Sequence, residues 1–170
     1  MVIGKTVRIR YPHLVEIGDN VIIDDFTYIS TSLNLDNYVH IASGCKLIGG
    51  PNAKINILNF STLSPNVVLA AGSDDYISGL ASPLVPISFK GNCKIGEINI
   101  GRHCIIGSNS TVLPNVLFND GAVVGAQSLV NKNLDAWTLY AGIPAKKIKL
   151  RDKLKILELE KLFKAQNNES

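Results

Sequence analysis

Two adjacent carboxylates, Asp74 and Asp75, stand between Ser73 and Tyr76 in a segment that is rich in Gly and Pro. A carboxylate can bind an ammonium group or take up a proton, and neighbouring hydroxyls can hold a polar molecule. His40 is a second candidate base, because an imidazole changes its protonation state near neutral pH. Both kinds of group suit chemistry in which a proton is moved.

The histidines and cysteines do not predict a metal site. His13, His40 and His103 are separated by 27 and 63 residues, whereas a zinc site built from three histidines needs two of them close together. The chain has three cysteines, an odd number without metal-ligand spacing, which fits a reducing compartment. We therefore expect no metal cofactor, and we expect any base to be a carboxylate or a single histidine.

Composition limits the class of protein. A length of 170 residues predicts one domain, and the net charge of +3 is too small to indicate nucleic-acid binding. No apolar run approaches the 18 residues of a membrane-spanning helix. The first residues lack the basic and then apolar layout of a signal peptide. The sequence therefore predicts a cytoplasmic protein.

An aliphatic residue recurs every six positions, and this repeat determines the predicted fold. A period of six is generated neither by a helix nor by simple alternation along a strand. Seventeen positions follow it, with slips of register after residues 9 and 47 and one long interruption after residue 69. They are Ile3, Ile9, Ile17, Ile23, Ile29, Leu35, Ile41, Leu47, Ile57, Leu63, Leu69, Ile100, Ile106, Val112, Phe118, Val124 and Val130.

Four residues after each aliphatic position the side chain is often small or β-branched, as at Thr27, Cys45, Ser61, Cys104 and Ser110. The pattern predicts a parallel β-helix in which each six-residue unit supplies one flat face and one tight corner. Gly and Asn tolerate the positive φ of such corners. Eighteen residues per turn give about six coils, and a spacing of about 4.8 Å predicts a prism roughly 29 Å tall. The two cysteines at corners are expected to be structural.

Two segments depart from the repeat. Residues 72–94 contain scattered Gly and Pro and no clean hexad, and a long irregular insertion in a compact domain is usually functional. A shorter insertion, residues 49–52, predicts a bulge at a corner. Residues 148–165 change to a helical period and predict an amphipathic helix that packs on the prism or on a partner. The expected organisation is a β-helix over 1–147, with its inserted loop, and a helical tail over 148–170.

The run from Ile98 to Lys147, with its closing signature Ala141–Lys146 (sequence AGIPAK), resembles the hexapeptide-repeat acetyltransferases of the branch that acetylates sugars and antibiotics. The resemblance implies an all-β, left-handed parallel β-helix. It also implies a homotrimer with active sites at subunit interfaces, each site completed by the inserted loop of a neighbouring subunit. Acetyl-CoA is the implied co-substrate.

In that family acetyl-CoA lies along the stacked coils of the C-terminal half. The positions of this sequence that match are Gly107, Ser108, Gly125, Ala126 and Ser128, where small side chains let the pantetheine arm approach closely. Lys146 and Lys147 follow the closing signature and are candidates to bind the CoA phosphates. Residues 146–170 carry a net charge of +4 (eight Lys and Arg against four Asp and Glu), and the remaining chain carries −1.

The family's catalytic His stands at the start of the long loop, and Asp74 or Asp75 occupies that place here. This departure favours N-acetylation, because an amine that loses its proton near neutral pH needs a weaker base than a hydroxyl. The run Ser73–Tyr76 resembles acetyltransferases of bacterial surface-polysaccharide pathways, several of which act on nucleotide-linked amino sugars. The resemblance thus implies catalytic roles for Asp74 or Asp75 and substrate contacts for Ser73 and Tyr76.

Two alternatives remain open at this point. In the first, His40, expected on the same outer face as Thr62 and Asn99, is the base of a sugar O-acetyltransferase. In the second, the chain is a non-catalytic β-helical scaffold. The leading prediction is acetyl-CoA-dependent N-acetylation of a nucleotide-linked amino sugar for O-antigen or another surface glycan, with no nucleic-acid partner and no membrane insertion.

Overall fold

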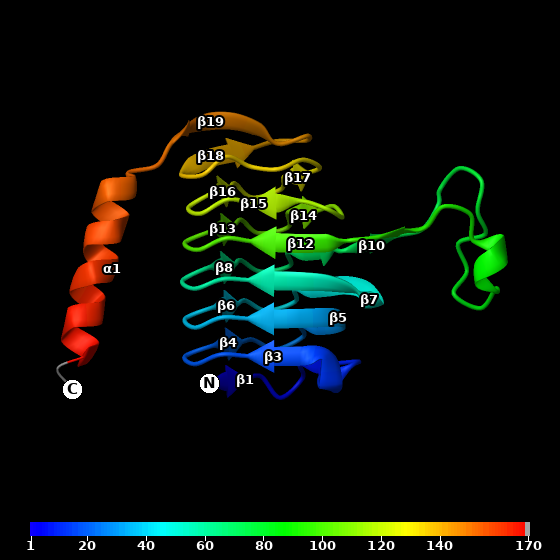
Figure 1. Ribbon diagram of the computed structural model, residues 1–170, viewed down its shortest axis with the longest axis horizontal. Coiled ribbons are helices and arrows are strands. Elements are labelled where there is room, and N and C mark those ends of the chain that lie inside the picture. Colours follow the sequence, from blue (N-terminus) through cyan, green and yellow to red (C-terminus); the bar gives the residue numbers. More distant parts are fainter. Residues whose placement is uncertain (169–170) are drawn as a thin grey trace.

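The period-six pattern folds into a three-sided prism of stacked coils, and the fold is the predicted left-handed parallel β-helix (Figure 1). The computed structural model describes residues 1–168. On the first face, seven strands stack in parallel, so that the described chain has one coil more than predicted. These strands are β1 (Val2–Ile3), β4 (Ile22–Ile23), β6 (His40–Ile41), β8 (Thr62–Leu63), β13 (Ile105–Ile106), β16 (Val123–Val124) and β18 (Thr138–Ala141).

The other two faces are joined into one sheet, because two long strands, β5 (Tyr28–Leu35) and β7 (Lys46–Ile57), run across the corner between them. The second face adds β2 (Arg8–Ile9), β9 (Val68–Ala70), β14 (Thr111–Val112) and β17 (Leu129–Val130). The third face adds β3 (Val15–Ile17), β12 (Glu97–Ile100) and β15 (Leu117–Phe118), and a short 3-10 turn, η1 (Pro12–Leu14), precedes β3.

The predicted inward positions form the core. All fourteen of them from Ile23 to Val130 are buried, and Ile9 and Ile17 pack partly against the core. Ile3 remains 41% exposed because it belongs to the end coil, which has a neighbour on one side only. Each fully buried aliphatic side chain contributes about 1.5–3 kcal/mol of transfer free energy, so these columns are the main source of stability.

One corner of the prism is aromatic, which the expected preference for Gly and Asn did not predict. Tyr38, Phe60, His103 and Trp137 all have positive φ, between 52° and 62°. Tyr38 and Phe60 stack with centroids 4.9 Å apart, and Phe60 stacks on His103 at 5.3 Å. Ring stacking contributes about 0.5–1.5 kcal/mol per pair, which offsets much of the roughly 1–2 kcal/mol cost of the left-handed backbone.

The short insertion is a bulge inside β7, as predicted. Thr31 of β5 lies opposite Gly50 and Ser32 lies opposite Lys54, so residues 51–53 are extra on one strand. The hydroxyl of Thr31 donates to the carbonyl of Ala53 at 2.8 Å and holds the bulge in place.

The tail differs from the prediction in where its helix begins. Residues Lys146–Leu150 form β19, which pairs antiparallel with β18, and the helix α1 therefore spans Lys153–Asn168 rather than starting at residue 148. Figure 1 shows α1 returning beside the prism. Phe163 meets Tyr38 and Phe60 edge-on, so the helix covers the aromatic corner. None of the described helices is both long and apolar enough to cross a membrane.

Candidate active site

The long insertion is an arm that leaves the prism as a hairpin (Figure 1). Its base consists of β10 (Gly72–Ser73) and β11 (Lys94–Ile95), paired antiparallel, and residues 74–93 beyond it are called the arm here. A 3-10 turn, η2 (Ile87–Phe89), shapes the far part of the arm. The hairpin brings the residues at its two ends together although they are about twenty positions apart in the chain.

A hollow of about 450 Å³ lies on the third face, where the outward residues are largely asparagines. Its polar groups are paired with one another or with the backbone: Asn56 Nδ2 donates to Asn99 Oδ1 at 2.7 Å, and Asp120 Oδ1 accepts the backbone N–H of Arg102. None of the residues predicted to be catalytic lines this hollow.

A depression of similar size, about 440 Å³, lies where the arm meets the prism, and we call it the arm-base depression. The predicted residues Ser73, Asp74 and Tyr76 all line it, so the structure brings these three together. The other lining residues come from β7, β9 and the two ends of the arm: Ile48, Gly49, Ala70, Gly72, Ile87, Lys90, Cys93, Lys94 and Ile95.

Asp75 ties the arm together through four hydrogen bonds. Its Oδ1 accepts the backbone N–H groups of Ile77 and Ser78, and its Oδ2 accepts the Ser78 hydroxyl at 2.8 Å and the backbone N–H of Asn92 at 2.9 Å. These hydrogen bonds, led by the one from Asn92, hold the pKa of Asp75 well below its ordinary value. Because these hydrogen bonds join the outgoing and returning chain, they favour Asp74 over Asp75 as the catalytic carboxylate.

Asp74 presents the available carboxylate. Its side chain is exposed in the arm-base depression, and its side-chain neighbour is Cys93, whose Sγ lies 3.9 Å from Oδ1. Cys93 Sγ also donates to the carbonyl of Lys90 at 3.4 Å. The two adjacent aspartates thus have different environments, and Asp74 retains its capacity to bind an ammonium group or a hydroxyl.

His40 lies on the first face, away from the arm, and forms a pair with Asp24. Its Nε2 is 2.9 Å from Asp24 Oδ2, and its side chain is 41% exposed. Thr62 is its neighbour in the next coil, as predicted. Asn99 is not on this face, because it pairs with Asn56 on the third face. A carboxylate–imidazole pair can act as a base, but within this chain it does not share a hollow with Asp74.

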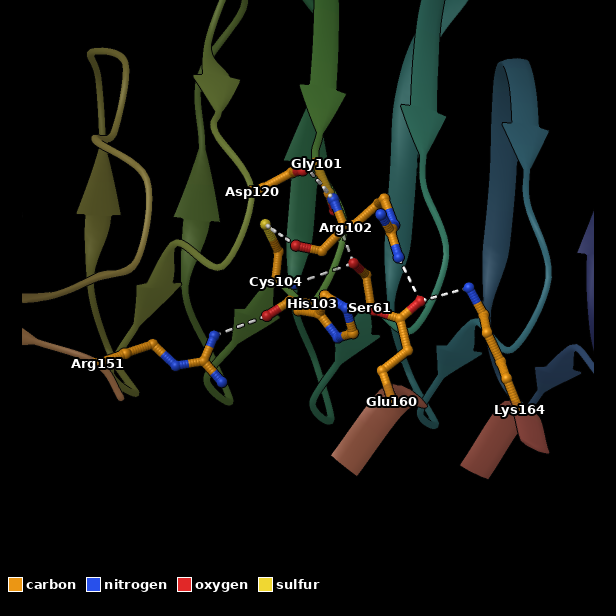
Figure 2. A network of polar contacts seen from close by, with 9 residues as sticks. All are labelled: Ser61, Gly101, Arg102, His103, Cys104, Asp120, Arg151, Glu160 and Lys164. Atoms are coloured by element: carbon orange, nitrogen blue, oxygen red, sulfur yellow. Dashed lines mark hydrogen bonds and ion pairs between the residues drawn. The ribbon is translucent and has the colours of Figure 1, made fainter. Parts of the chain in front are cut away.

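The remaining histidines have structural surroundings. His13 lies in η1, edge-on to Tyr11. His103 is buried between Phe60 and the helix α1, and its Nε2 is 2.8 Å from Glu160 Oε2. Figure 2 shows Glu160 reaching from α1 to this corner.

In Figure 2 the carboxylate of Glu160 faces Arg102 of the prism and Lys164 of the helix. It pairs with Arg102 and His103 of the prism and with Lys164 one turn along the helix, while only 7% of its side chain is exposed. Burial alone would raise the pKa of Glu160, but the hydrogen bonds from Lys164 and His103 and the charge of Arg102 lower it below its ordinary value. Arg151 Nη1, donating to the carbonyls of His103 and Gly121, ties down the segment before the helix.

Gly107 and Gly125, two of the positions predicted for CoA, lie in one column of the closing coils. A Cβ on Gly107 would lie 2.4 Å from the backbone nitrogen of Ala126, so no side chain can stand there. Gly125 lies directly on the next coil along, since β13 pairs with β16. Gly107 therefore has to be a glycine for the coils to stack here.

Ser128 does not belong to that column. It is only 3% exposed, its Oγ donates to the carbonyl of Gly125 at 2.8 Å, and it accepts the backbone N–H of Gly142 at 3.0 Å. Its hydroxyl faces the corner and satisfies the backbone there, so Ser128 is a less accessible cofactor candidate than Gly107 or Gly125.

Comparison with known proteins identifies the family. No protein-family model matches the chain. A dTDP-4-amino-4,6-dideoxy-D-glucose acyltransferase of Escherichia coli is 40% identical over 155 residues, which cover 88% of this chain and 78% of that protein. The chain belongs to the hexapeptide-repeat sugar acyltransferases. A putative lipopolysaccharide biosynthesis O-acetyl transferase of E. coli K12, WbbJ, is 32% identical and matches 72% of this acyltransferase and 59% of its own length.

Solved structures agree with this assignment. AntD, an N-acyltransferase from Bacillus cereus in complex with dTDP and 3-hydroxybutyryl-CoA, superposes with a TM-score of 0.91 at 39% identity, covering 98% of this chain and 87% of AntD. A variant of AntD in complex with dTDP-4-amino-4,6-dideoxyglucose and coenzyme A gives the same TM-score at 37% identity, with 96% and 87% covered. This acyltransferase is accordingly an enzyme that uses an acyl-CoA.

Lys146 and Lys147, which were predicted to bind CoA phosphates, lie on β19 at the end of the stack of coils. Both are exposed, and Lys147 Nζ approaches Asp135 Oδ2 at 3.7 Å. The C-terminal half of the prism therefore contains both these lysines and the small residues Gly107, Ser108, Gly125 and Ala126. Asp74, in contrast, lies at the arm. The sequence predicted Asp74 but not Lys90 or Lys94. These two lysines belong to no recognisable motif, and only the pairing of β10 with β11 brings them near Asp74.

Proposed function

We propose that this acyltransferase transfers an acyl group, acetyl in the simplest case, from acyl-CoA to the amino group of a nucleotide-linked amino sugar. The observation that carries the proposal is the exposed carboxylate of Asp74 in the arm-base depression, beside an Asp75 that accepts four hydrogen bonds within the arm. The E. coli relative named for dTDP-4-amino-4,6-dideoxy-D-glucose and the AntD complexes support a dTDP-linked 4-amino sugar as acceptor.

The proposed reaction needs little base catalysis. The amine nitrogen attacks the thioester carbonyl carbon, the C–N bond forms, the C–S bond breaks, and the nitrogen gives up a proton while CoA leaves as a thiol. Asp74 binds the ammonium form of the sugar and takes up the proton that must leave before attack. A carboxylate suffices for this task because an amine, unlike a hydroxyl, exists partly in its neutral nucleophilic form near neutral pH.

A second feature of the AntD structures supports Asp74 as this carboxylate. The AntD variants that were solved replace an aspartate and a serine ten positions apart in that chain. Asp74 and Ser64 have the same separation here. Ser64 lies at the end of β8, next to the column of Gly107 that we propose for the pantetheine arm, because its backbone N–H donates to the carbonyl of Ile106.

We propose that the enzyme assembles as a homotrimer with its active sites between subunits. The arm supports this, because Ile77 and Leu84 are 96% and 92% exposed and Tyr76, Ile87 and Phe89 are also largely exposed. An apolar arm that protrudes from its own subunit is stabilised when it lies against a neighbouring subunit. Such docking would place the Asp74 of one subunit near the cofactor column of the next.

The proposed product fits the synthesis of a bacterial surface glycan such as an O-antigen, in agreement with the name of the WbbJ relative. The test is acyl transfer from acetyl-CoA and from 3-hydroxybutyryl-CoA to dTDP-4-amino-4,6-dideoxyglucose, followed by mass spectrometry. We expect one acyl group on the sugar nitrogen. Absence of transfer from either donor would overturn the proposal.

Sugar O-acetylation is the second candidate, because the His40–Asp24 pair has the geometry of a base. The variant His40→Ala separates the two functions. Loss of transfer to hydroxyl acceptors, together with no transfer to amino sugars by the unaltered enzyme, would favour O-acetylation. Unchanged N-acylation in His40→Ala would assign the imidazole no part in the proposed reaction.

A further inference from the structure

We propose that Lys90 and Lys94 bind the diphosphate of the sugar nucleotide and so determine that the acceptor is nucleotide-linked. This inference rests on the proposed function and extends it from the amino group to the activated end of the acceptor. Both lysines line the arm-base depression together with Asp74. Sequence spacing gives no sign of the pair, because Lys90 and Lys94 lie on the returning part of the arm and reach Asp74 only through the fold.

The hairpin fixes the position of Lys94. Ser73 and Lys94 are direct partners in the antiparallel pairing of β10 with β11, and in such a pair the two Cα atoms lie about 4.5–5.5 Å apart. Asp74 follows Ser73 directly, so the carboxylate and this ammonium group start from neighbouring backbone positions. Both Asp74 and Lys94 line the depression.

The backbone around Lys90 is held in place by hydrogen bonds, including one that Asp75 accepts from the nearby Asn92. The backbone N–H of Lys90 donates to the carbonyl of Ile87 at 3.1 Å, and its carbonyl accepts from Cys93 Sγ. Asp75 binds the N–H of Asn92 and its Oδ2 lies against Gly91, where a Cβ would come within 2.4 Å of that oxygen. Hydrogen bonds thus hold the backbone on both sides of Lys90, while no ion pair among the described residues involves its side chain.

The charges of the depression match those of a nucleotide-linked amino sugar. Such a molecule has a diphosphate with two negative charges at one end and an ammonium group on the sugar. The depression has two ammonium groups and one available carboxylate. In the part of the chain that the structure describes, no ion pair involves Lys90 or Lys94, whereas Asp75 is fully engaged. Lysine binds phosphate as a point charge, so two unpaired lysines suit this ligand.

CoA also carries phosphates, but the candidate lysines for them lie elsewhere. Lys146 and Lys147 are on β19 at the end of the stack, while the arm leaves the prism near its middle (Figure 1). Binding of the two ligands can therefore be measured separately.

The experiment is isothermal titration of the full-length protein with dTDP, with thymidine and with CoA. The variants are Lys90→Gln, Lys94→Gln and the double variant, and Lys5→Gln, an exposed lysine of the first coil, is the matched control. We expect each single variant to weaken dTDP binding about tenfold and the double variant about a hundredfold. Thymidine and CoA binding should stay unchanged, as should dTDP binding by Lys5→Gln.

Unchanged dTDP affinity in the double variant would overturn the inference while the proposed N-acylation stands. A loss of CoA affinity instead of dTDP affinity would assign the two lysines to the cofactor and would also overturn it. An equal loss of dTDP and thymidine binding would point to a disturbed arm rather than a diphosphate subsite, and would again overturn it. If the variants change dTDP binding as expected but the unaltered enzyme does not acylate amino sugars, the diphosphate subsite is supported and the proposed reaction is rejected.

Discussion

His103 Nε2 lies 2.8 Å from Glu160 Oε2, so a buried carboxylate on the C-terminal helix is held by a histidine of the aromatic corner. Arg102 and Lys164 pair with the same carboxylate. Removal of one partner from such a group leaves the others without compensation, which is the costly way to break a buried ion pair. Glu160 therefore contributes more to fixing the helix on the prism than the apolar side chains of the helix do, because several of those are exposed.

We predict that Glu160→Ala lowers the free energy of unfolding by about 2 kcal/mol, since Arg102 and Lys164 can turn toward water but His103 cannot. For a protein of this size that corresponds to a fall in Tm of about 6 °C by scanning calorimetry. Glu158→Ala is the control, because its pair with Lys155 is exposed and contributes less than about 0.5 kcal/mol. Equal effects of the two variants would refute a fixing role for Glu160.

Glu160 also predicts how stability depends on pH. The partners of its carboxylate, Lys164, His103 and Arg102, lower its pKa in the folded state, so its contribution is present above the ordinary value of 4.5 and is lost as the pH falls below it. Unfolding by denaturant, followed between pH 7 and pH 3, should show a steeper loss of stability below pH 4.5 for the unaltered enzyme than for Glu160→Gln. Parallel curves would contradict this assignment.

The adjacent aspartates should respond differently to replacement. Asp74→Asn is expected to reduce kcat/KM for the amino sugar by about a hundredfold without changing Tm, because it removes the carboxylate that binds the ammonium group. Asp75→Ala is expected to raise KM and to make the arm sensitive to protease, because four hydrogen bonds are lost. Limited proteolysis and steady-state kinetics on both variants measure this. Protease sensitivity in Asp74→Asn, or its absence in Asp75→Ala, would reverse the assignment.

The three thiols should differ in reactivity. Burial raises the pKa of Cys45 to about 11 and that of Cys104 to about 12, and both side chains are inaccessible. Cys93 is partly exposed in the arm-base depression. Iodoacetamide at pH 8 should therefore add one label per chain, at Cys93, and dTDP-4-amino-4,6-dideoxyglucose should slow it. Mass spectrometry that finds a label on Cys104 in the folded protein would contradict the burial described here.

The repeat could be predicted from the sequence because the burial of each inward residue follows from its position in the six-residue period. Leu63 or Val112 needs only its place in a period of six to be placed in the core, and the structure confirms it. The first coil follows the same period, but Ile3 stays exposed because stacking, and not the sequence of the coil, buries a side chain.

The roles of Asp75 and Glu160 could not be predicted, because their partners are distant in the chain. Asn92 lies 17 residues from Asp75, and His103 lies 57 residues from Glu160. The aromatic corner was missed for a related reason. Phe60 is a poor choice for positive φ when it is considered alone, and it becomes acceptable only with Tyr38 on one side and His103 on the other.

The hairpin at the base of the arm has a consequence for how such enzymes diversify. Gly72 faces Ile95 across the ladder, so the two ends of the arm leave the prism at adjacent points. Loop closure becomes only slightly more costly as a loop lengthens. We therefore expect an arm of another length or sequence, grafted between Ser73 and Lys94, to leave the fold of the prism intact.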